Sequence, residues 1–365
     1  MSQKISVALL FGGKSAEHEV SLQSAKNIYE AIDKNNYDVK LIGVDRDGKW
    51  YLNDAKVLLD NSDPDLLKLN HSNTKLSLIP GDDSHKIIDI KNNQSLDKID
   101  VVFPVMHGPF GEDGTIQGLL KLAGIPYVGA GVLGSAIGMD KDVMKRLLKQ
   151  ANIPVAKFMV MKKHQKVEWT YNKIKTILNP PFFVKPANLG SSVGIHKIHD
   201  ESEFEKFVED AFQFDTKLIF EETITGREIE CSVLGNEDPI ASVCGEVKAQ
   251  HEFYDYDAKY IDVHGALLQI PADIPQKTEK KIQDLAIKTF QCLECSGMAR
   301  VDFFLKDNDE ILVNELNTIP GFTKISMYPK LWEASGISYA ELINRLIELA
   351  LEKFEQESRL KTSYN

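Results

Sequence analysis

Short apolar runs, each followed by glycine or polar residues, open the chain. The run ISVALLF at residues 5–11 predicts a buried strand, and residues 21–32, after a glycine-rich turn, predict a helix. VKLIGVD at residues 39–45 and IDVVFPVMHG at residues 99–108 predict further strands. Strands that alternate with helices are typical of a parallel sheet, so we expect an α/β unit here. Residues 49–98 are polar and rich in Asn, Asp and Ser, which predicts peripheral structure and loops.

A capped helix follows this unit. GMDKDVMKRLLKQANIP predicts a helix that begins after Asp140 and ends near Pro154. The β-branched and aromatic runs after it predict antiparallel strands in a small α+β unit. From about Gly226 the chain is again rich in strand patterns, and SYAELINRLIELALEKF predicts an amphipathic helix near its end.

Charge and hydropathy exclude several classes of partner. The chain has 54 acidic and 43 basic residues, a formal net charge of -11, and no long Lys/Arg run. We therefore expect neither nucleic acid nor a membrane surface as a partner. The first apolar run is preceded by one Lys and followed by GGKSAEHE, which does not resemble a cleavage site. These features predict a cytoplasmic protein.

A polar face on a predicted hairpin is the first candidate for chemistry. ARVDFFLKDNDEILVNELN predicts two strands joined by a two-residue turn at Asn308 and Asp309. That turn places Asp302 opposite Glu315, and Arg300 opposite Asn317, all on one face. Two adjacent carboxylates and an amide are oxygen ligands that suit magnesium. The alternative is a solvated sheet face with an Arg–Asp ion pair.

Two glycine-containing segments bear on phosphate binding. In FFVKPANLGSSVG, Lys185 ends a predicted strand, and a loop with Gly190, Ser191 and Ser192 follows, so its amides and hydroxyls could close over phosphates. The GGKS near the start of the chain is not a Walker motif, because Ala8 stands where the upstream glycine is required. It is not a dinucleotide fingerprint either, since G-x-G-x-x-G is absent.

Six motifs occur in order between about Ile5 and Leu351: GGKSAEHEVS, HGPFGEDG, VKPANLGSSVG, EFYDYDAKY, ARVDFF and NELNTIPGFT. With them the sequence resembles the D-alanine:D-alanine ligases of the ATP-grasp superfamily. The resemblance implies a three-domain ATP-grasp fold of mixed α/β and α+β class: an N-terminal Rossmann-like parallel domain at 1–138, a central subdomain at 139–225 and a catalytic domain at 226–365. It also implies ATP and D-alanine as substrates, two Mg²⁺ ions with Mn²⁺ as an alternative, a homodimer, and a role in peptidoglycan precursor synthesis.

The resemblance also assigns roles to individual residues. The ATP contacts are assigned to Lys141, Lys185, Ser192, Glu221, Glu222, Ile224, Glu228 and Lys259, with Glu222 at a position where some relatives carry Lys. The metal ligands are assigned to Asp302, Glu315 and Asn317. Arg300 and the amide of Gly321 are assigned to the oxyanion of the reaction.

Substrate contacts and a closing lid are assigned in the same way. Glu17 is expected to hold the ammonium of the first D-alanine, with His107 and Glu112 either supporting that pocket or only forming a turn. Ser326 and the amide of Met327 are expected to hold the carboxylate of the second, and Ser191 and Tyr260 to latch a lid onto Glu17.

The identity of Tyr260 bears on the acceptor. Relatives that use D-lactate carry His or Phe at the corresponding lid position, so Tyr favours an amine acceptor and the dipeptide product. D-lactate or D-serine as acceptor is the nearest alternative. A dinucleotide-dependent oxidoreductase and a catalytically silent ATP-grasp regulator are the alternatives from other classes.

Overall fold

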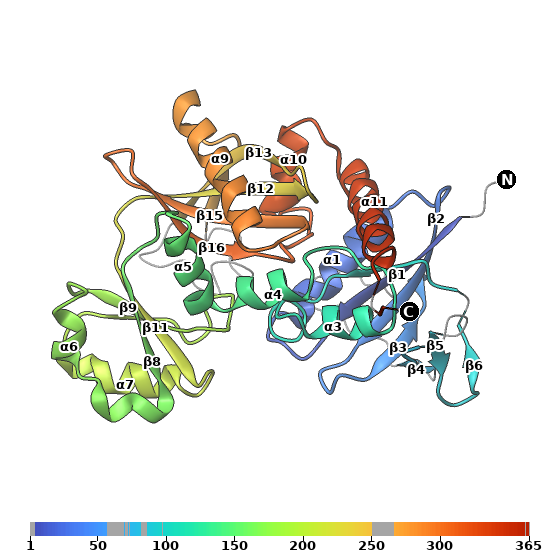
Figure 1. Ribbon diagram of the computed structural model, residues 1–365, viewed down its shortest axis with the longest axis horizontal. Helices are drawn as coiled ribbons and strands as arrows, with labels where there is room; N and C mark the ends of the chain where they lie inside the picture. The colour runs from blue at the N-terminus through green and yellow to red at the C-terminus, as the bar shows by residue number, and fades with distance from the viewer. Residues whose placement is uncertain are drawn as a thin grey trace.

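The computed structural model describes residues 4–56, 69, 72, 74–81, 86–96, 98–249, 266–361 and 363–364. Three sheets follow one another along the chain, and helices pack against each of them (Figure 1). In the described part of the chain, every helix is too short or too polar to cross a bilayer.

The first sheet combines parallel and antiparallel strands. Its strand order is β6-β5-β4-β3-β2-β1-β7. The parallel part consists of β1 (Ile5–Gly12), β2 (Tyr37–Val44) and β7 (Val101–Pro104), and α1 (His18–Ala31) connects β1 to β2. These elements confirm the predicted α/β unit, because the apolar runs that suggested strands are buried on both faces of the sheet.

Residues 49–98 contain more regular structure than the sequence predicted. Four short strands extend the first sheet by antiparallel pairing: β3 (Trp50–Asn53), β4 (Lys75–Leu78), β5 (Ile87–Asp89) and β6 (Gln94–Ser95). Each has two to four residues, which is too short to give a clear period-two pattern among polar neighbours.

The second sheet is antiparallel, with the order β10-β9-β11-β8. Its strands are β8 (Phe158–Lys162), β9 (Phe182–Pro186), β10 (His196–Ile198) and β11 (Lys217–Glu222). The 3-10 helix η2 (Lys163–Glu168), α6 (Tyr171–Lys175) and α7 (Glu201–Ala211) accompany it. Three helices connect the first sheet to the second: α3 (Thr115–Leu122), α4 (Val132–Met139) and α5 (Lys141–Gln150).

The third sheet is also antiparallel, with the order β14-β13-β12-β15-β16. Its strands are β12 (Arg227–Gly235), β13 (Ile240–Ala249), β14 (Ala266–Gln269), β15 (Gly297–Leu305) and β16 (Ile311–Asn317). Helices α9 (Gln276–Cys292) and α10 (Met327–Ala334) pack on it.

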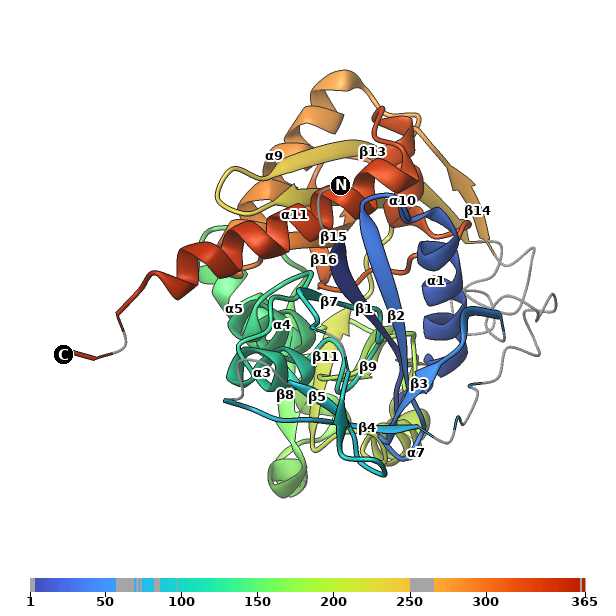
Figure 2. The same cartoon turned by 90° about the vertical axis from the view of Figure 1, so that its right-hand side faces the viewer.

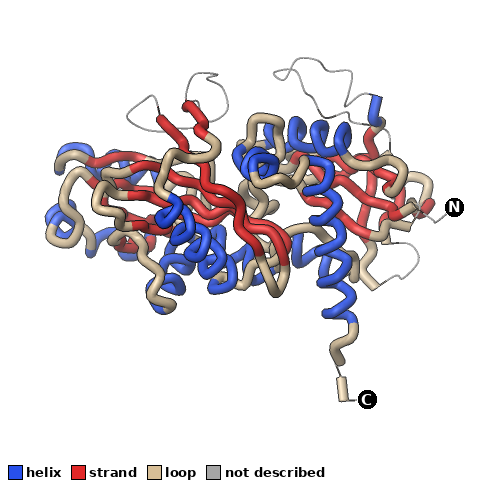
Figure 3. Tube along the Cα trace, turned by 90° about the horizontal axis from the view of Figure 1, so that it is seen from above, coloured by secondary structure: helices blue, strands red, loops and turns tan. Residues whose placement is uncertain are grey.

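The last helix, α11 (Tyr339–Ser358), returns to the first sheet and confirms the predicted amphipathic helix. Its apolar side chains, including Leu342, Leu346 and Ile347, share one core with Leu9 and Phe103 of the first sheet. Figures 2 and 3 show α11 running beside that sheet and its final turns extending beyond the body. The helix thus ties the two ends of the chain together.

Candidate active site

The β15–β16 hairpin carries the polar face that the sequence predicted. Asp302 pairs with Glu315, and Arg300 pairs with Asn317, as expected. The predicted two-residue turn is wrong, however. Lys306 and Glu310 close a three-residue turn, and an extra residue in β16, Asn314, shifts the register between Asp302 and Phe303. The longer turn and the bulge compensate, so the functional pairs meet where the simpler hairpin would place them.

The face is highly charged, with Asp302 buried and Arg300, Glu315 and Asn317 half-buried. Asp302 is only 9% exposed, so the alternative of a solvated sheet face is wrong, although its Arg–Asp ion pair is present. Arg300 Nε lies 2.7 Å from Asp302 Oδ1 and 2.8 Å from Glu230 Oε2. Burial alone would lower the pKa of Arg300, but the Asp302 and Glu230 carboxylates raise it well above its usual value. Arg300 is therefore a fixed positive charge held between two carboxylates.

The donor set fits a magnesium ion. Asn317 Nδ2 donates to Asp302 Oδ2 at 3.0 Å, and Glu315 stands opposite Asp302 in the ladder. In the part of the chain that is described, no three His, Cys, Asp or Glu side chains gather as a ready-made metal cage. Two carboxylates and an amide carbonyl agree with Mg²⁺, which usually takes one or two carboxylates and completes its shell with water and phosphate oxygens.

Lys141 lies between this face and the glycine–serine loop. Asp140 caps α5 by accepting from the amides of Asp142 and Val143, which confirms the predicted helix start. Lys141 Nζ donates to the carbonyl of Leu189 at 2.7 Å and lies 3.5 Å from Glu315 Oε2. One ammonium thus contacts both the loop and a predicted metal ligand.

A second charge cluster lies beside the first. Glu221 on β11 forms two ion pairs: its Oε1 lies 2.7 Å from Lys145 Nζ, and its Oε2 lies 2.6 Å from Lys185 Nζ. Burial alone would raise the pKa of Glu221, but the two lysines lower it to about 2. Lys145 was missed at the sequence level, because a lysine on an amphipathic helix is usually assigned to the solvent side.

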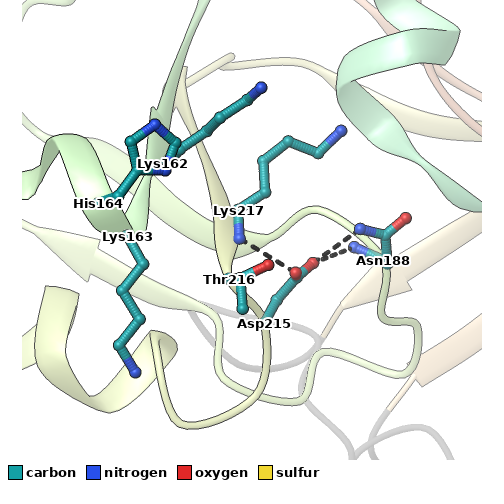
Figure 4. A pocket seen from close by; sticks show the side chains of 7 residues that line it. All are labelled: Lys162, Lys163, His164, Asn188, Asp215, Thr216 and Lys217. Atoms are coloured by element: carbon teal, nitrogen blue, oxygen red, sulfur yellow. Dashed lines mark hydrogen bonds between the residues drawn. The ribbon is translucent and has the colours of Figure 1, made fainter.

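The glycine–serine loop reaches the first sheet. Ser191 and Ser192 both have positive φ, at 51° and 60°, and Ser191 Oγ donates to Glu17 Oε1 at 2.5 Å. The predicted contact between Ser191 and Glu17 is therefore present. Asp215 holds the start of the loop, since it accepts from the backbone and side-chain nitrogens of Asn188 at 2.9 Å each. Figure 4 shows these bonds. Asn188 and Asp215 also line a cavity of about 700 Å³.

Glu17 has buried neighbours on the first sheet's loops. His107 is 4% exposed, and its ring nitrogens lie 3.0 Å from the carbonyl of Ile319 and 3.2 Å from Ser24 Oγ. These contacts hold the loop after β16 in place, so in this structure His107 contacts protein groups through both nitrogens. Burial lowers its pKa, although the Glu17 charge opposes that shift.

Glu112 bridges the same two loops. Its carboxylate accepts from the amide of Gly108 at 2.6 Å and from the amide of Ile319 at 3.2 Å. Burial, and then the charge of Glu17, raises its pKa to about 8. The HGPFGEDG segment is thus more than a surface turn, because it fixes both backbone groups of Ile319 near Gly321.

The segment after β16 places the remaining predicted contacts. Ser326 precedes α10, whose first residue is Met327, so the Met327 amide lies at a helix N-terminus. Ser326 Oγ accepts from the amide of Thr323 at 3.0 Å, and a Cβ at Gly321 would lie 2.8 Å from it. A side chain at position 321 would therefore collide with Ser326.

The segment between β11 and β12 lines a second cavity. A cavity of about 470 Å³ there is lined by Glu222 and Ile224 together with Val155, Lys157 and Leu312, among others. Glu222 Oε1 accepts a hydrogen bond from the amide of Lys157 at 2.7 Å, so the Glu222 side chain is held against the residue that precedes β8. Glu228 follows on β12. Lys259 and Tyr260, which the sequence assigns to a lid, lie outside the described residues.

Comparison with known proteins identifies the family. Residues 6–130 match the family model for the D-ala D-ala ligase N-terminus, and residues 147–348 match the model for the C-terminus. The chain belongs to the D-alanine–D-alanine ligase family. The ATP-grasp fold class and the family, both implied by the motifs, are thereby confirmed, and membership implies use of ATP.

Relatives of this family are similar over nearly the whole chain. A D-alanine–D-alanine ligase of Oceanobacillus iheyensis is 54% identical over 361 residues, covering 99% of each chain. D-alanine–D-alanine ligase A of Salmonella typhimurium is 51% identical, also covering 99% of each. The solved ligase of Coxiella burnetii has a TM-score of 0.87 at 41% identity, covering 98% of this chain and 97% of that one. The VanG D-Ala:D-Ser ligase of Enterococcus faecalis has a TM-score of 0.85 at 38% identity, covering 95% of this chain and all of that one.

Proposed function

We propose that this enzyme joins two D-alanine molecules into D-alanyl-D-alanine, with cleavage of ATP to ADP and phosphate. The observation that supports the proposal is the shared face of Asp302, Glu315, Asn317 and Arg300, on which two carboxylates and an amide lie beside a fixed cation. Family membership and the relatives at 51–54% identity support the same reaction.

The chemistry explains why so much positive charge is concentrated here. A carboxylate is a poor electrophile, because its charge repels a nucleophile and oxide is a poor leaving group. Transfer of the terminal phosphoryl group of ATP to the first D-alanine creates an acyl phosphate, which the amine of the second can attack. We assign Lys141 and Lys185 to neutralising the phosphate tail, and Arg300 with the amide of Gly321 to stabilising the oxyanion; the ion pairs of the two lysines with Glu315 and Glu221 support a charged site here.

The metal assignment is part of the proposal. Asp302, Glu315 and Asn317 would hold Mg²⁺, or Mn²⁺ in its place, with Glu315 shared between two ions. Bound there, the ions would neutralise charge on the phosphate oxygens. The protein's own contribution is the ladder that keeps these oxygen atoms on one face.

The substrate pockets follow from the loops around this face. We place the first D-alanine near Glu17, whose carboxylate would hold its ammonium, and the second near Ser326 and the Met327 amide, which would hold its carboxylate. ATP would lie between the second and third sheets, near Ser192 and Ile224, with Glu228 binding its ribose. Lys259 and Tyr260 are proposed as lid residues from sequence alone, and Tyr260 favours an amine acceptor.

Three coarser features complete the proposal. We place domain boundaries at 138/139, between the strands of the first and second sheets, and at 225/226, between those of the second and third. We propose a cytoplasmic enzyme that supplies peptidoglycan precursors. We also propose a homodimer, for which the exposed Leu122 and Leu133 on the contacting helices α3 and α4 are candidate interface residues.

Product analysis tests the proposed reaction. Phosphate release from MgATP is measured with D-alanine, D-serine and D-lactate, each alone and in pairs, and the product is identified by mass spectrometry. We expect D-alanine alone to suffice and to give the dipeptide at neutral pH. Turnover that requires D-lactate or D-serine as the second substrate would instead favour the VanG-like alternative.

A further inference from the structure

Lys145 is a fully buried lysine that the proposed mechanism does not use. It lies on α5, and its side chain is 1% exposed. Figure 1 shows α5 between the second sheet, which contains β11, and the third, which contains β16. Its Nζ lies 2.7 Å from Glu221 Oε1 on β11 and donates to the carbonyl of Asn314 on β16 at 2.9 Å. A single ammonium group therefore links the two sheets.

The contact with Asn314 falls on the bulge in β16. The ladder pairs Phe303 with Val313 on one side of the bulge and Asp302 with Glu315 on the other. A bulge takes its residue out of regular pairing, and a buried carbonyl then needs another donor. Lys145 is such a donor. Because side chains alternate along a strand, the extra residue decides which face Glu315 occupies.

The contact with Glu221 concerns charge. Glu221 also accepts from Lys185 Nζ at 2.6 Å, so two lysines share one carboxylate. The three groups together carry a net charge of one positive unit. Without Lys145, Lys185 and Glu221 would form a neutral buried pair, and a phosphate tail would have to compete with Glu221 for Lys185.

We propose that Lys145 is a positioning residue for the bound nucleotide. It acts through its neighbours: the Asn314 bulge keeps Glu315 on the metal-binding face, and the shared Glu221 leaves the positive charge of Lys185 available to phosphate. The inference rests on the proposed function to the extent that ATP and Mg²⁺ bind on this face.

The test compares Lys145→Met with the wild-type chain. Methionine keeps an unbranched apolar stem but removes the ammonium. We expect the KM for MgATP to rise about tenfold, as for loss of a charged hydrogen bond, and the KM for D-alanine to change by less than about twofold. In calorimetry, MgADP binding should weaken about tenfold, with a higher Mg²⁺ concentration needed for half-maximal binding. Lys149→Met, which alters an exposed lysine on the same helix, is the matched control and should match wild type.

Several outcomes would decide against the inference. A folded Lys145→Met with wild-type MgATP kinetics and MgADP binding overturns it, and so does a lower melting temperature without a change in KM, because that result indicates a structural role only. If Lys145→Met does not fold, Lys145→Gln decides, since its amide can still donate a hydrogen bond but carries no positive charge. A raised KM for MgATP in that variant supports the inference, and a wild-type KM overturns it.

Failure of the proposed function would look different. A wild-type chain that makes no product from D-alanine and MgATP would refute the reaction. MgADP binding requires no amino acid, so its calorimetry would still report on Lys145.

Discussion

Ser191 donates a hydrogen bond to Glu17, which joins the loop after β9 to the segment between β1 and α1. The contact connects the glycine–serine loop with the proposed site of the first D-alanine. It fixes one carboxylate oxygen of Glu17 and so orients the other. The pair therefore couples the position of the loop to the pocket for the amino acid.

Ser191→Ala tests that coupling. Loss of the hydroxyl leaves Glu17 less well oriented, so the KM for D-alanine at the first site should rise about tenfold, while MgADP binding changes by less than about threefold. Initial rates over a wide D-alanine range measure both apparent KM values. Ser358→Ala, at an exposed serine of α11, is the control. An unchanged first-site KM would separate this hydrogen bond from substrate binding.

Arg300→Lys tests the proposed oxyanion charge. Lysine keeps one positive charge but cannot make the two parallel bonds to Asp302, at 2.7 Å each. We expect kcat to fall about 10²–10³-fold, with MgADP binding largely preserved. The control is Arg227→Lys, which alters an arginine that also bonds a carboxylate through two nitrogens, here Glu246 in the same sheet. Equal loss of turnover and nucleotide binding would contradict the role given to Arg300.

Glu315→Gln tests the metal assignment. The amide lacks the charge that a divalent ion requires, so the Mg²⁺ concentration for half-maximal activity should rise about tenfold or more. Magnesium titrations at fixed ATP, after removal of metal with EDTA, provide the measurement. Glu310→Gln, at the exposed end of the same hairpin, should behave as wild type. A Mg²⁺ requirement that is identical in all three proteins would exclude Glu315 as a ligand.

The Glu221 cluster predicts an effect of pH on stability. The pKa of Glu221 in the folded state is about 2, below its ordinary value of 4.5, because Lys145 and Lys185 outweigh the effect of burial. The unfolded state therefore binds more protons in this window, and the stabilisation is present above pH 4.5 and lost as pH falls toward 2.

Glu221→Gln checks this prediction by thermal unfolding at several pH values. The variant should be less stable at pH 7, by about 3–5 kcal/mol if breaking a buried pair sets the scale, and its stability should fall less steeply between pH 4.5 and 2. Glu209→Gln removes a carboxylate from the ion pair with Lys166 at the surface and should leave the profile unchanged. Parallel profiles for Glu221→Gln and wild type would be inconsistent with a lowered pKa.

The proposed dimer can be tested at α3 and α4. Leu122 is 77% exposed and Leu133 58%, which is unusual for leucines on two helices in contact. Leu122→Asp with Leu133→Asp should convert a dimer into a monomer, as measured by light scattering during gel filtration. Val167→Asp alters an apolar residue of η2 that is 93% exposed and serves as the control. A wild-type monomer at micromolar concentration would refute the dimer itself.

The sequence predicted the β15–β16 hairpin and the pairing of its polar residues, but not its turn or its bulge. Asp302 and Glu315 were paired correctly, but through a turn that is one residue too short and without the bulge at Asn314. Asp309 has a φ of 60°, and its role in a longer turn is not visible in polar composition alone. The longer turn and the bulge are local features of the backbone, and the alternation of hydrophobic and polar residues does not predict either of them.

Long-range contacts explain the other omissions. Lys145 looks like a surface lysine on an amphipathic helix, and only the approach of β11 and β16 makes it a buried link. Glu112 likewise looks like a turn residue until the loop after β16 supplies the amide of Ile319. A sequence pattern describes one element at a time, whereas these roles depend on two elements that meet in space.

The return of α11 to the first sheet also constrains how the protein is made. One face of the first sheet is completed by Leu342, Leu346 and Ile347, which leave the ribosome long after Leu9 and Phe103. During synthesis that apolar surface stays exposed to water, or bound by a chaperone, until α11 has been translated and packs against it. Native closure of this core is therefore a late event after translation of α11, and a nascent chain halted before Tyr339 would be prone to aggregate.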